Sequence, residues 1–119
     1  MKNLKIIGLT LFILMMTTTA VFAANSSVSV YVPGNAPFSD ATDSIIGQNQ
    51  YGKATINSSG AFSDFIHEYC NGKDTVYHYD MPNGGTKTIT YYMSSGCSYK
   101  LFVKSDGVFP VVGNLQNYQ

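Results

Sequence analysis

The feature that most constrains this chain is a series of short alternating segments separated by turns that contain glycine. From residue 57 onward, five connections in a row contain glycine and are three to five residues long: NSSG, NGK, MPNGG, SSG and SDG. Alternation of apolar and polar residues is typical of half-buried strands, and turns of this length are typical of hairpins. The sequence therefore predicts an all-β domain built from successive hairpins.

The residue types favour the same fold class. The chain holds nine tyrosines and seven phenylalanines, and only 12% of its residues are charged. Aromatic and β-branched side chains suit a pleated, half-buried surface, whereas nothing here resembles a long run of helix-forming residues. We expect a small antiparallel β-sandwich or a partly closed barrel.

One segment, residues 61–70, supports two interpretations. Phe62, Phe65, Ile66 and Tyr69 recur at helical spacing, and Asn71-Gly72 would end such a helix. The segment is nevertheless short and rich in Phe, Ile and Tyr, which favours a strand. We interpret it as a strand and keep a short helix as the alternative.

The N-terminus has the three parts of a secretory signal peptide. Lys2 and Lys5 precede an apolar run over residues 6–16, and Val21-Phe22-Ala23 provides a cleavage site after Ala23. A spanning helix needs about 20 apolar residues, and three threonines interrupt this run. We therefore predict a cleavable signal helix over 1–23 and a single secreted β domain over 24–119. The domain would be extracellular, or periplasmic if the source has an outer membrane, with no membrane span after cleavage.

The charge of the expected mature chain restricts its partners. It holds five lysines, no arginine and seven acidic residues, a formal charge of −2. Binding to phosphates needs a basic face, and arginine is the usual reader of base edges. Nucleic acid is therefore excluded as a predicted partner. The partner that we expect is an extracellular or cell-surface protein or glycan.

The two cysteines, Cys70 and Cys97, both lie in the exported part. Two cysteines in a small exported domain usually pair. If strands alternate in direction along the chain, both cysteines lie at the same end of the domain. In the strand that begins at Cys97, alternation places Tyr99, Leu101 and Val103 on the same face as Cys97. Phe102 shares the other face with lysines. We predict a Cys70–Cys97 disulfide.

The stretch from Phe65 to Asp80 gathers both histidines of the chain and several acids. A metal site needs three or four ligands at one point. If the stretch is two strands joined by a turn, alternation spreads these residues along the pair. We expect no metal and no cofactor there. A small hydrolase remains the enzyme alternative, and its residues would be His67, Glu68, His78 and Asp80.

Tyrosines supply the other candidate site. Tyr77, Tyr79 and Tyr92 form a candidate binding surface, because tyrosine joins an apolar ring to a polar tip. Alternation over residues 86–93 places three threonines and Tyr92 on one face, which resembles a flat polar binding surface. The competing interpretation is a tyrosine-rich core.

Together these patterns predict a non-enzymatic binding protein that acts at or outside the cell surface. A bacteriocin-like antagonist belongs to this class. A carbohydrate- or wall-binding module that uses exposed tyrosines is one alternative, and the small hydrolase is the other.

Overall fold

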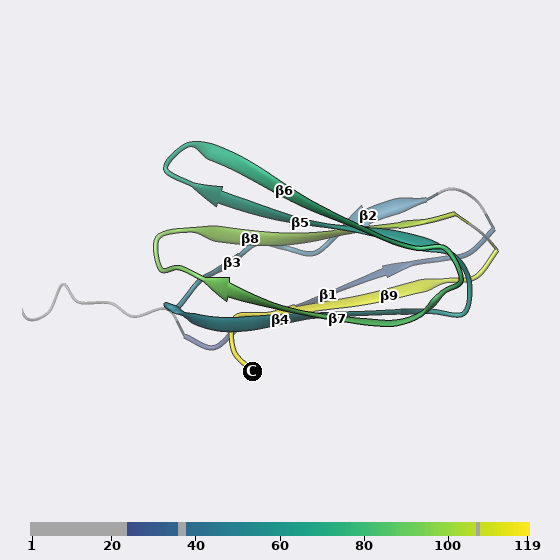
Figure 1. Ribbon diagram of the computed structural model, residues 1–119, viewed down its shortest axis with the longest axis horizontal. Helices are drawn as coiled ribbons and strands as arrows, with labels where there is room; N and C mark the ends of the chain where they lie inside the picture. The colour runs from purple at the N-terminus through teal and green to yellow at the C-terminus, as the bar shows by residue number, and fades with distance from the viewer. Residues whose placement is uncertain (1–23, 36–37, 107) are drawn as a thin grey trace, which may run out of the picture.

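The structure is a computed structural model, and it describes residues 24–35, 38–106 and 108–119. Two antiparallel sheets pack face to face, as Figure 1 shows. The predicted all-β sandwich with one disulfide is confirmed. The predicted signal helix over 1–23 lies outside the described residues. Within the described ranges no helix is long and apolar enough to cross a membrane.

Sheet A has four strands in the order β1-β9-β4-β7. Their bounds are Ser27–Val32, Val111–Gln116, Gln50–Ser58 and Gly85–Met93. Sheet B has five strands, with the order β2-β8-β5-β6 and a short β3 that also pairs with β8. Their bounds are Ser39–Ala41, Ser98–Ser105, Phe62–Cys70, Lys73–Met81 and, for β3, Ile45–Ile46.

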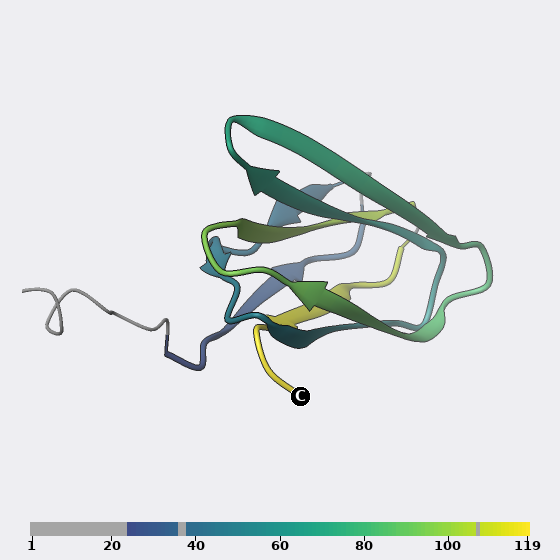
Figure 2. The same ribbon diagram turned by 60° about the vertical axis from the view of Figure 1, so that its left-hand side comes forward.

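The path of the chain differs from a run of successive hairpins. Of the five glycine-containing connections, only the one between β5 and β6 joins neighbours in one sheet, whereas β7 pairs with β4 and β9 pairs with β1 and β4. The chain therefore crosses repeatedly from sheet to sheet, which Figure 2 makes visible. A short turn can span the roughly 10 Å between packed sheets as well as it closes a hairpin, so turn length alone did not reveal this path.

The single hairpin turn has the residues that its geometry requires. Asn71 and Gly72 both have positive φ, 51° and 78°. A two-residue turn of this kind needs φ > 0 at both positions, and Asn-Gly is its favoured sequence. Within segment 61–70, Phe62–Cys70 forms strand β5, as predicted, and it pairs over its whole length with β6.

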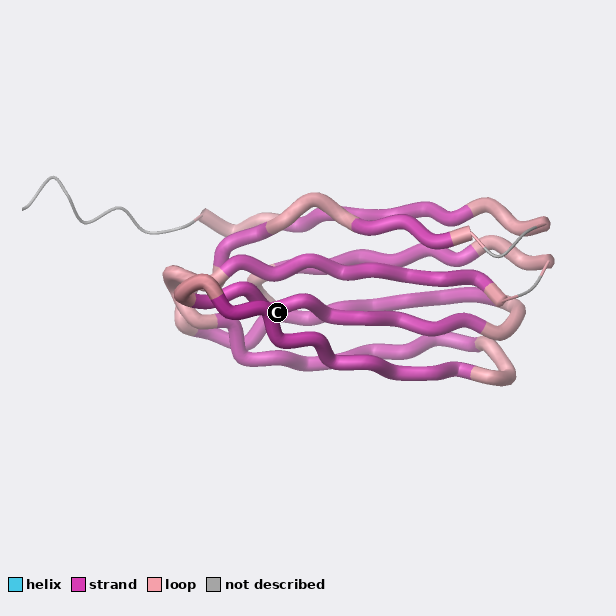
Figure 3. The backbone as a smooth tube through the Cα atoms, turned by 90° about the horizontal axis from the view of Figure 1, so that it is seen from above, coloured by secondary structure: helices cyan, strands magenta, loops and turns pink. Residues whose placement is uncertain are grey.

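The core lies between the sheets and consists of inward-facing residues from both. Alternation predicted these faces correctly in two strands. In β8, Tyr99, Leu101 and Val103 are fully buried, and in β7 Ile89 and Met93 are buried while the three threonines are exposed. Seen from above in Figure 3, the strands of both layers run along one common direction, with the turns at the two ends. Each sheet therefore has one outer face open to solvent.

Candidate functional site

Strands β5, β6 and β8 place imidazole, aromatic and charged side chains on the outer side of sheet B. Their positions alternate with the buried ones along each strand. We call this surface the imidazole–aromatic face, and its members are Ser63, Phe65, His67, Tyr69, Asp74, Val76, His78, Asp80, Lys100, Phe102 and Lys104.

Two pairs of rings form the middle of this face. Phe65 and His78 lie opposite each other in register and stack, with ring centroids 4.5 Å apart and an interplanar angle of 7°. His67 and Phe102 are tilted, with centroids 4.7 Å apart, and the Lys100 ammonium lies 5.9 Å from the Phe102 ring. These contacts hold the rings in defined positions on rigid strands.

Each histidine also has a carboxylate partner. His67 Nδ1 lies 3.2 Å from Asp74 Oδ2, and His78 Nε2 lies 2.8 Å from Asp80 Oδ1. The Ser63 hydroxyl donates to the same Asp80 oxygen at 2.7 Å. The Ser63 hydrogen bond and then His78 hold the pKa of Asp80 below its usual value.

The order of these groups bears on the hydrolase alternative. A serine nucleophile is activated by a histidine that accepts its proton, and the acid lies behind the histidine. Here Asp80 lies between Ser63 and His78, so the serine donates to the acid instead. Within the described ranges no three His, Cys, Asp or Glu side chains converge as metal ligands. The two acid–imidazole pairs therefore remain separate on the face.

Glu68 does not join His67. It lies on the inner side of β5, where its carboxylate accepts hydrogen bonds from the hydroxyls of Tyr91 and Tyr99 at 2.9 and 3.0 Å. The grouping of Glu68 with the histidines in the enzyme alternative is therefore not formed. Alternation along β5 carries this information, because Glu68 shares its parity with the buried Ile66.

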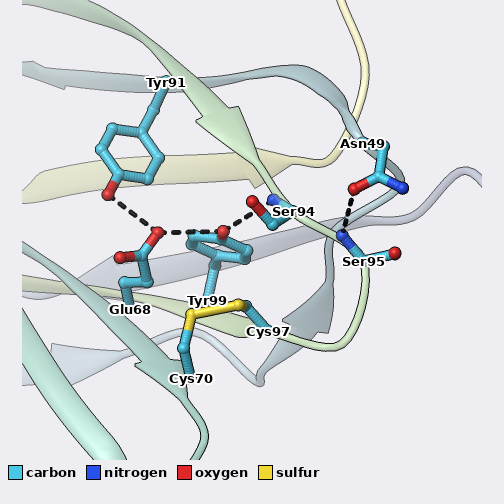
Figure 4. The surroundings of a disulfide bond; sticks show 8 residues. All are labelled: Asn49, Glu68, Cys70, Tyr91, Ser94, Ser95, Cys97 and Tyr99. Atoms are coloured by element: carbon cyan, nitrogen blue, oxygen red, sulfur yellow. Dashed lines mark hydrogen bonds between the residues drawn. A yellow bond between two sulfur atoms is a disulfide. The ribbon is translucent and has the colours of Figure 1, made fainter.

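The Glu68 network adjoins the disulfide, as Figure 4 shows. Cys70 and Cys97 are bonded, with Cα atoms 4.6 Å apart, and they extend the register of β5 and β8 by one pair. The Tyr99 hydroxyl also accepts from the Ser94 backbone N–H at 2.8 Å. Burial chiefly raises the pKa of Tyr99, to about 12, although the Ser94 N–H opposes the rise. This network fixes the turn that carries Cys97, so we assign it a structural role.

A second carboxyl lies beneath the imidazole–aromatic face. Asp64 is fully buried, and neither of its oxygens has a hydrogen-bond partner among the described residues. It is in register with Tyr79 on β6 and Val103 on β8. Burial raises the pKa of Asp64 to about 6, although the nearby Lys87 ammonium opposes this rise. Sequence alternation places Asp64 on the inner side of β5, but it does not reveal that the carboxyl lacks a partner.

Shallow depressions flank Phe102. One of about 270 Å³ lies between β5, β8 and Ser39, and one of about 340 Å³ lies toward Tyr69 and Ser44; both include His67 and Phe102 in their walls. A larger hollow of about 660 Å³ lies elsewhere, between the first residues of the β domain and the Asp43–Ile46 segment. Among the described residues that line this hollow, Asp43 is the one with a titratable side chain.

The outer side of sheet A has a different chemistry. We call it the hydroxyl face, because its members are mostly hydroxyl and amide side chains: Ser27, Ser29, Tyr31, Tyr51, Lys53, Thr55, Asn57, Thr86, Thr88, Thr90, Tyr92, Val112, Asn114 and Gln116. The exposed fractions of Tyr31, Tyr51 and Tyr92 are 60%, 55% and 45%.

The structure separates the three tyrosines of the candidate binding surface. Tyr77 and Tyr79 turn inward, where they are half-buried and pack against the core. Tyr92 lies on the hydroxyl face of the other sheet. The sequence analysis did not identify Phe65 as a surface residue, nor Tyr31 and Tyr51 as members of the face that carries the threonines of β7. Alternation indicates an outward Phe102, but only the strand order places it beside His67.

No protein-family model matches this sequence, and no curated protein sequence is significantly similar to it. Solved structures with related shapes include murine APRIL, at 6% identity and a TM-score of 0.43 over 76% of this chain and 98% of that one. Yersinia pseudotuberculosis-derived mitogen matches at 11% identity and a TM-score of 0.44, over 82% and 88% of the two chains. A de novo designed double-stranded β-helix matches at 12% identity and 0.36, over 77% and 95%. Similarity this low assigns no function.

Proposed function

We propose that the mature chain is an exported binding protein without a catalytic centre, and that it docks a protein partner on the imidazole–aromatic face at or outside the cell surface. The observation that carries this proposal is the pair of ring contacts, Phe65 on His78 and His67 on Phe102, on the outer side of sheet B, where His78 is exposed and the other three rings are half-buried. Rings at the centre and charged groups around them match the composition of protein interfaces.

The surroundings of the rings support a docking role. Lys100 and Lys104 lie on one flank, and Asp74 and Asp80 lie on the other, so the rim offers both signs of charge. Binding costs side-chain entropy when residues become ordered. The stacked rings are already held by their neighbours, so this cost is small at the centre of the face.

Export rests on the N-terminal pattern, and the disulfide is compatible with it. We expect secreted material to begin at Ala24. Sequencing of the N-terminus of the secreted protein tests this, and a secreted product that retains Met1–Ala23 would contradict it. A secreted antagonist of the bacteriocin type is the finer form of the proposal, and it predicts growth inhibition of whole cells without turnover of small substrates.

The test is binding of fluorescently labelled mature protein to intact cells, measured by flow cytometry. We expect Phe102→Ala to weaken binding by roughly tenfold or more, because truncation of a central aromatic residue removes a hot spot. Asn83→Ala, in the exposed turn between β6 and β7, is the matched control for a folded variant, and far-UV circular dichroism checks both. Equal binding by the Phe102→Ala variant and the native protein would contradict the proposal. Substrate turnover that is lost in His78→Ala would favour the hydrolase instead.

A further inference from the structure

The hydroxyl face is a grid formed by the register of four strands. Paired residues on adjacent strands lie side by side, so the outer side chains form rows across the sheet. Rows are two residues apart, about 6.8 Å, and neighbouring strands are about 4.8 Å apart. From one end to the other the rows are Tyr51 and Tyr92; Ser27, Gln116, Lys53 and Thr90; Ser29, Asn114, Thr55 and Thr88; and Tyr31, Val112, Asn57 and Thr86.

Aromatic rings stand at both ends of this grid. Tyr51 and Tyr92 meet edge to face, with centroids 5.4 Å apart, in the first row. Tyr31 is exposed in the last row. Three row intervals separate them, which corresponds to roughly 20 Å along the strands. A ligand that contacts both ends must therefore be long, and it must offer surfaces on which a tyrosine ring can stack.

Between these rings, and beside Tyr31 in the last row, the face offers hydroxyl and amide groups in fixed positions. Asn57 Nδ2 donates to Thr86 Oγ1 at 3.0 Å, and Asn114 Nδ2 donates to the hydroxyls of Ser27 and Ser29 at 2.9 and 3.0 Å. Hydroxyl and amide groups both donate and accept hydrogen bonds. They complement a ligand that is itself covered with hydroxyl groups.

Charge and polarity narrow the choice of ligand. Lys53 is the one charged side chain among the described members of this face, and Val112 is the one aliphatic member. A nearly neutral surface complements an uncharged ligand. A protein partner would need an apolar centre, and the middle rows lack it. The face therefore differs from the imidazole–aromatic face in the class of molecule that it suits.

We propose that the hydroxyl face binds a neutral polysaccharide. The chain lies along the strands, with Tyr51 and Tyr92 stacking on sugar rings at one end and Tyr31 at the other, while the serines, threonines and amides hydrogen-bond the sugar hydroxyls between them. This second binding surface is independent of the protein-docking face proposed above.

The experiment is a depletion assay with the mature, disulfide-bonded protein. The probes are powdered chitin, powdered cellulose and soluble starch immobilised on beads, with alginate and chitosan as charged polymers. We expect retention on at least one neutral polymer, with little change when salt is raised, because ion pairs contribute little to a neutral complex. Retention on none of the neutral polymers, or salt-sensitive retention on the charged ones alone, would overturn the proposal.

Variants locate the site. We expect the double change Tyr51→Ala/Tyr92→Ala to weaken retention on the order of tenfold or more, and Tyr31→Ala to weaken it by several-fold, as for aromatic contacts at interfaces. Thr55→Val keeps the shape of the grid and should also weaken retention. The control Phe102→Ala alters only the opposite face and should bind the polymer like the native protein.

Two further results would count against the proposal. Unchanged retention in all three hydroxyl-face variants would place the polymer elsewhere. The second is a native protein that sediments as a dimer, together with a Tyr92→Ala variant that sediments as a monomer. That result would assign the hydroxyl face to a second copy of this chain. Far-UV circular dichroism of each variant confirms its fold before binding is compared.

Discussion

The two outer faces of the sandwich obey the same alternation rule but present opposite chemistry. The hydroxyl face of sheet A is nearly neutral, and it consists mostly of hydroxyl and amide side chains. The imidazole–aromatic face of sheet B carries both histidines of the chain together with lysines, acids and stacked rings. Inward residues of both sheets serve one shared core, so only the outer positions are free to differ. The chemistry of one outer face can therefore change without altering the other.

The layers beneath the faces differ as well. Behind sheet A the buried strand residues are mainly aliphatic, such as Val30, Ile56 and Leu115. Behind sheet B lie Asp64, whose carboxyl has no hydrogen-bond partner among the described residues, the inward Glu68 and the disulfide at the end of β5 and β8. Buried polar groups are costly unless they are satisfied. We therefore expect the stability of sheet B to depend more on pH and on the redox state of the cysteines than the stability of sheet A does.

The largest effect should follow loss of the disulfide. The bridge closes a loop of about 28 residues, and the chain-entropy model assigns it about 3.5 kcal/mol. Replacing both Cys70 and Cys97 by serine should therefore lower the free energy of unfolding by that order, measured by urea denaturation. Because the bond joins β5 to β8, amide hydrogen exchange should accelerate more in sheet B than in β1 and β9. Equal acceleration of exchange in both sheets would contradict the expected difference between them.

A pH-dependent effect should come next, from Asp64. The pKa of Asp64 in the folded protein, about 6, exceeds its ordinary value of 3.8, so the folded state keeps a proton that the unfolded state releases between these values. The contribution of Asp64 to the free energy of unfolding is therefore complete below the pKa of the unfolded state, and it is lost as the pH rises through about 6. At about 1.4 kcal/mol per pKa unit, the loss is about 3 kcal/mol.

The measurement is the difference between native protein and Asp64→Asn in free energy of unfolding from pH 3.5 to 7.5, since this difference cancels titration of Asp80 and other shared groups. We expect the native protein to lose stability relative to the variant as the pH rises through this range. Asp106→Asn, at an exposed position, is the control and should follow the native curve. A constant difference between native protein and Asp64→Asn would contradict the raised pKa.

A smaller effect is expected where the two sheets are joined near the chain ends. The buried Asn117 amide donates to the carbonyls of Ala24 and Ile46 and accepts from the Ser26 N–H. Asn117→Ala would leave these buried groups without partners, at a cost of about 2 kcal/mol. Thermal unfolding of the variant measures this. A change below 0.5 kcal/mol would show that water replaces the amide without loss.

The smallest effect should be on the hydroxyl face. Thr88 is exposed and lies in the middle of the grid. Thr88→Val should alter the free energy of unfolding by less than about 0.5 kcal/mol, as for most surface changes. Urea denaturation checks this value. If Thr88→Val proved strongly destabilising, the face would be part of the stability of sheet A, and its proposed freedom to specialise for binding would be refuted.

The sequence alone indicated the long strands, and in β7 and β8 alternation also identified the side that faces outward. It left open whether Tyr77 and Tyr79 are exposed, and it did not predict the short strands β2 and β3. Period two is a local property, so the threonines of β7 and the buried residues of β8 were identified before any strand was paired. The direction of successive strands likewise placed Cys70 and Cys97 at one end, because each short turn reverses the chain. The same alternation placed His78 and Asp80 on one side of their strand.

The pairing of the strands depends on the tertiary structure, because a short turn can connect two strands of one sheet or two strands of different sheets. That choice put Phe102 beside His67, aligned the four rows of the hydroxyl face, and separated Tyr92 from Tyr77 and Tyr79. It also enclosed Asp64 between the sheets, where its carboxyl has no hydrogen-bond partner within the part of the chain that the structure describes. These are non-local results: they depend on contacts between segments far apart in the chain, which a period or a turn signal does not encode.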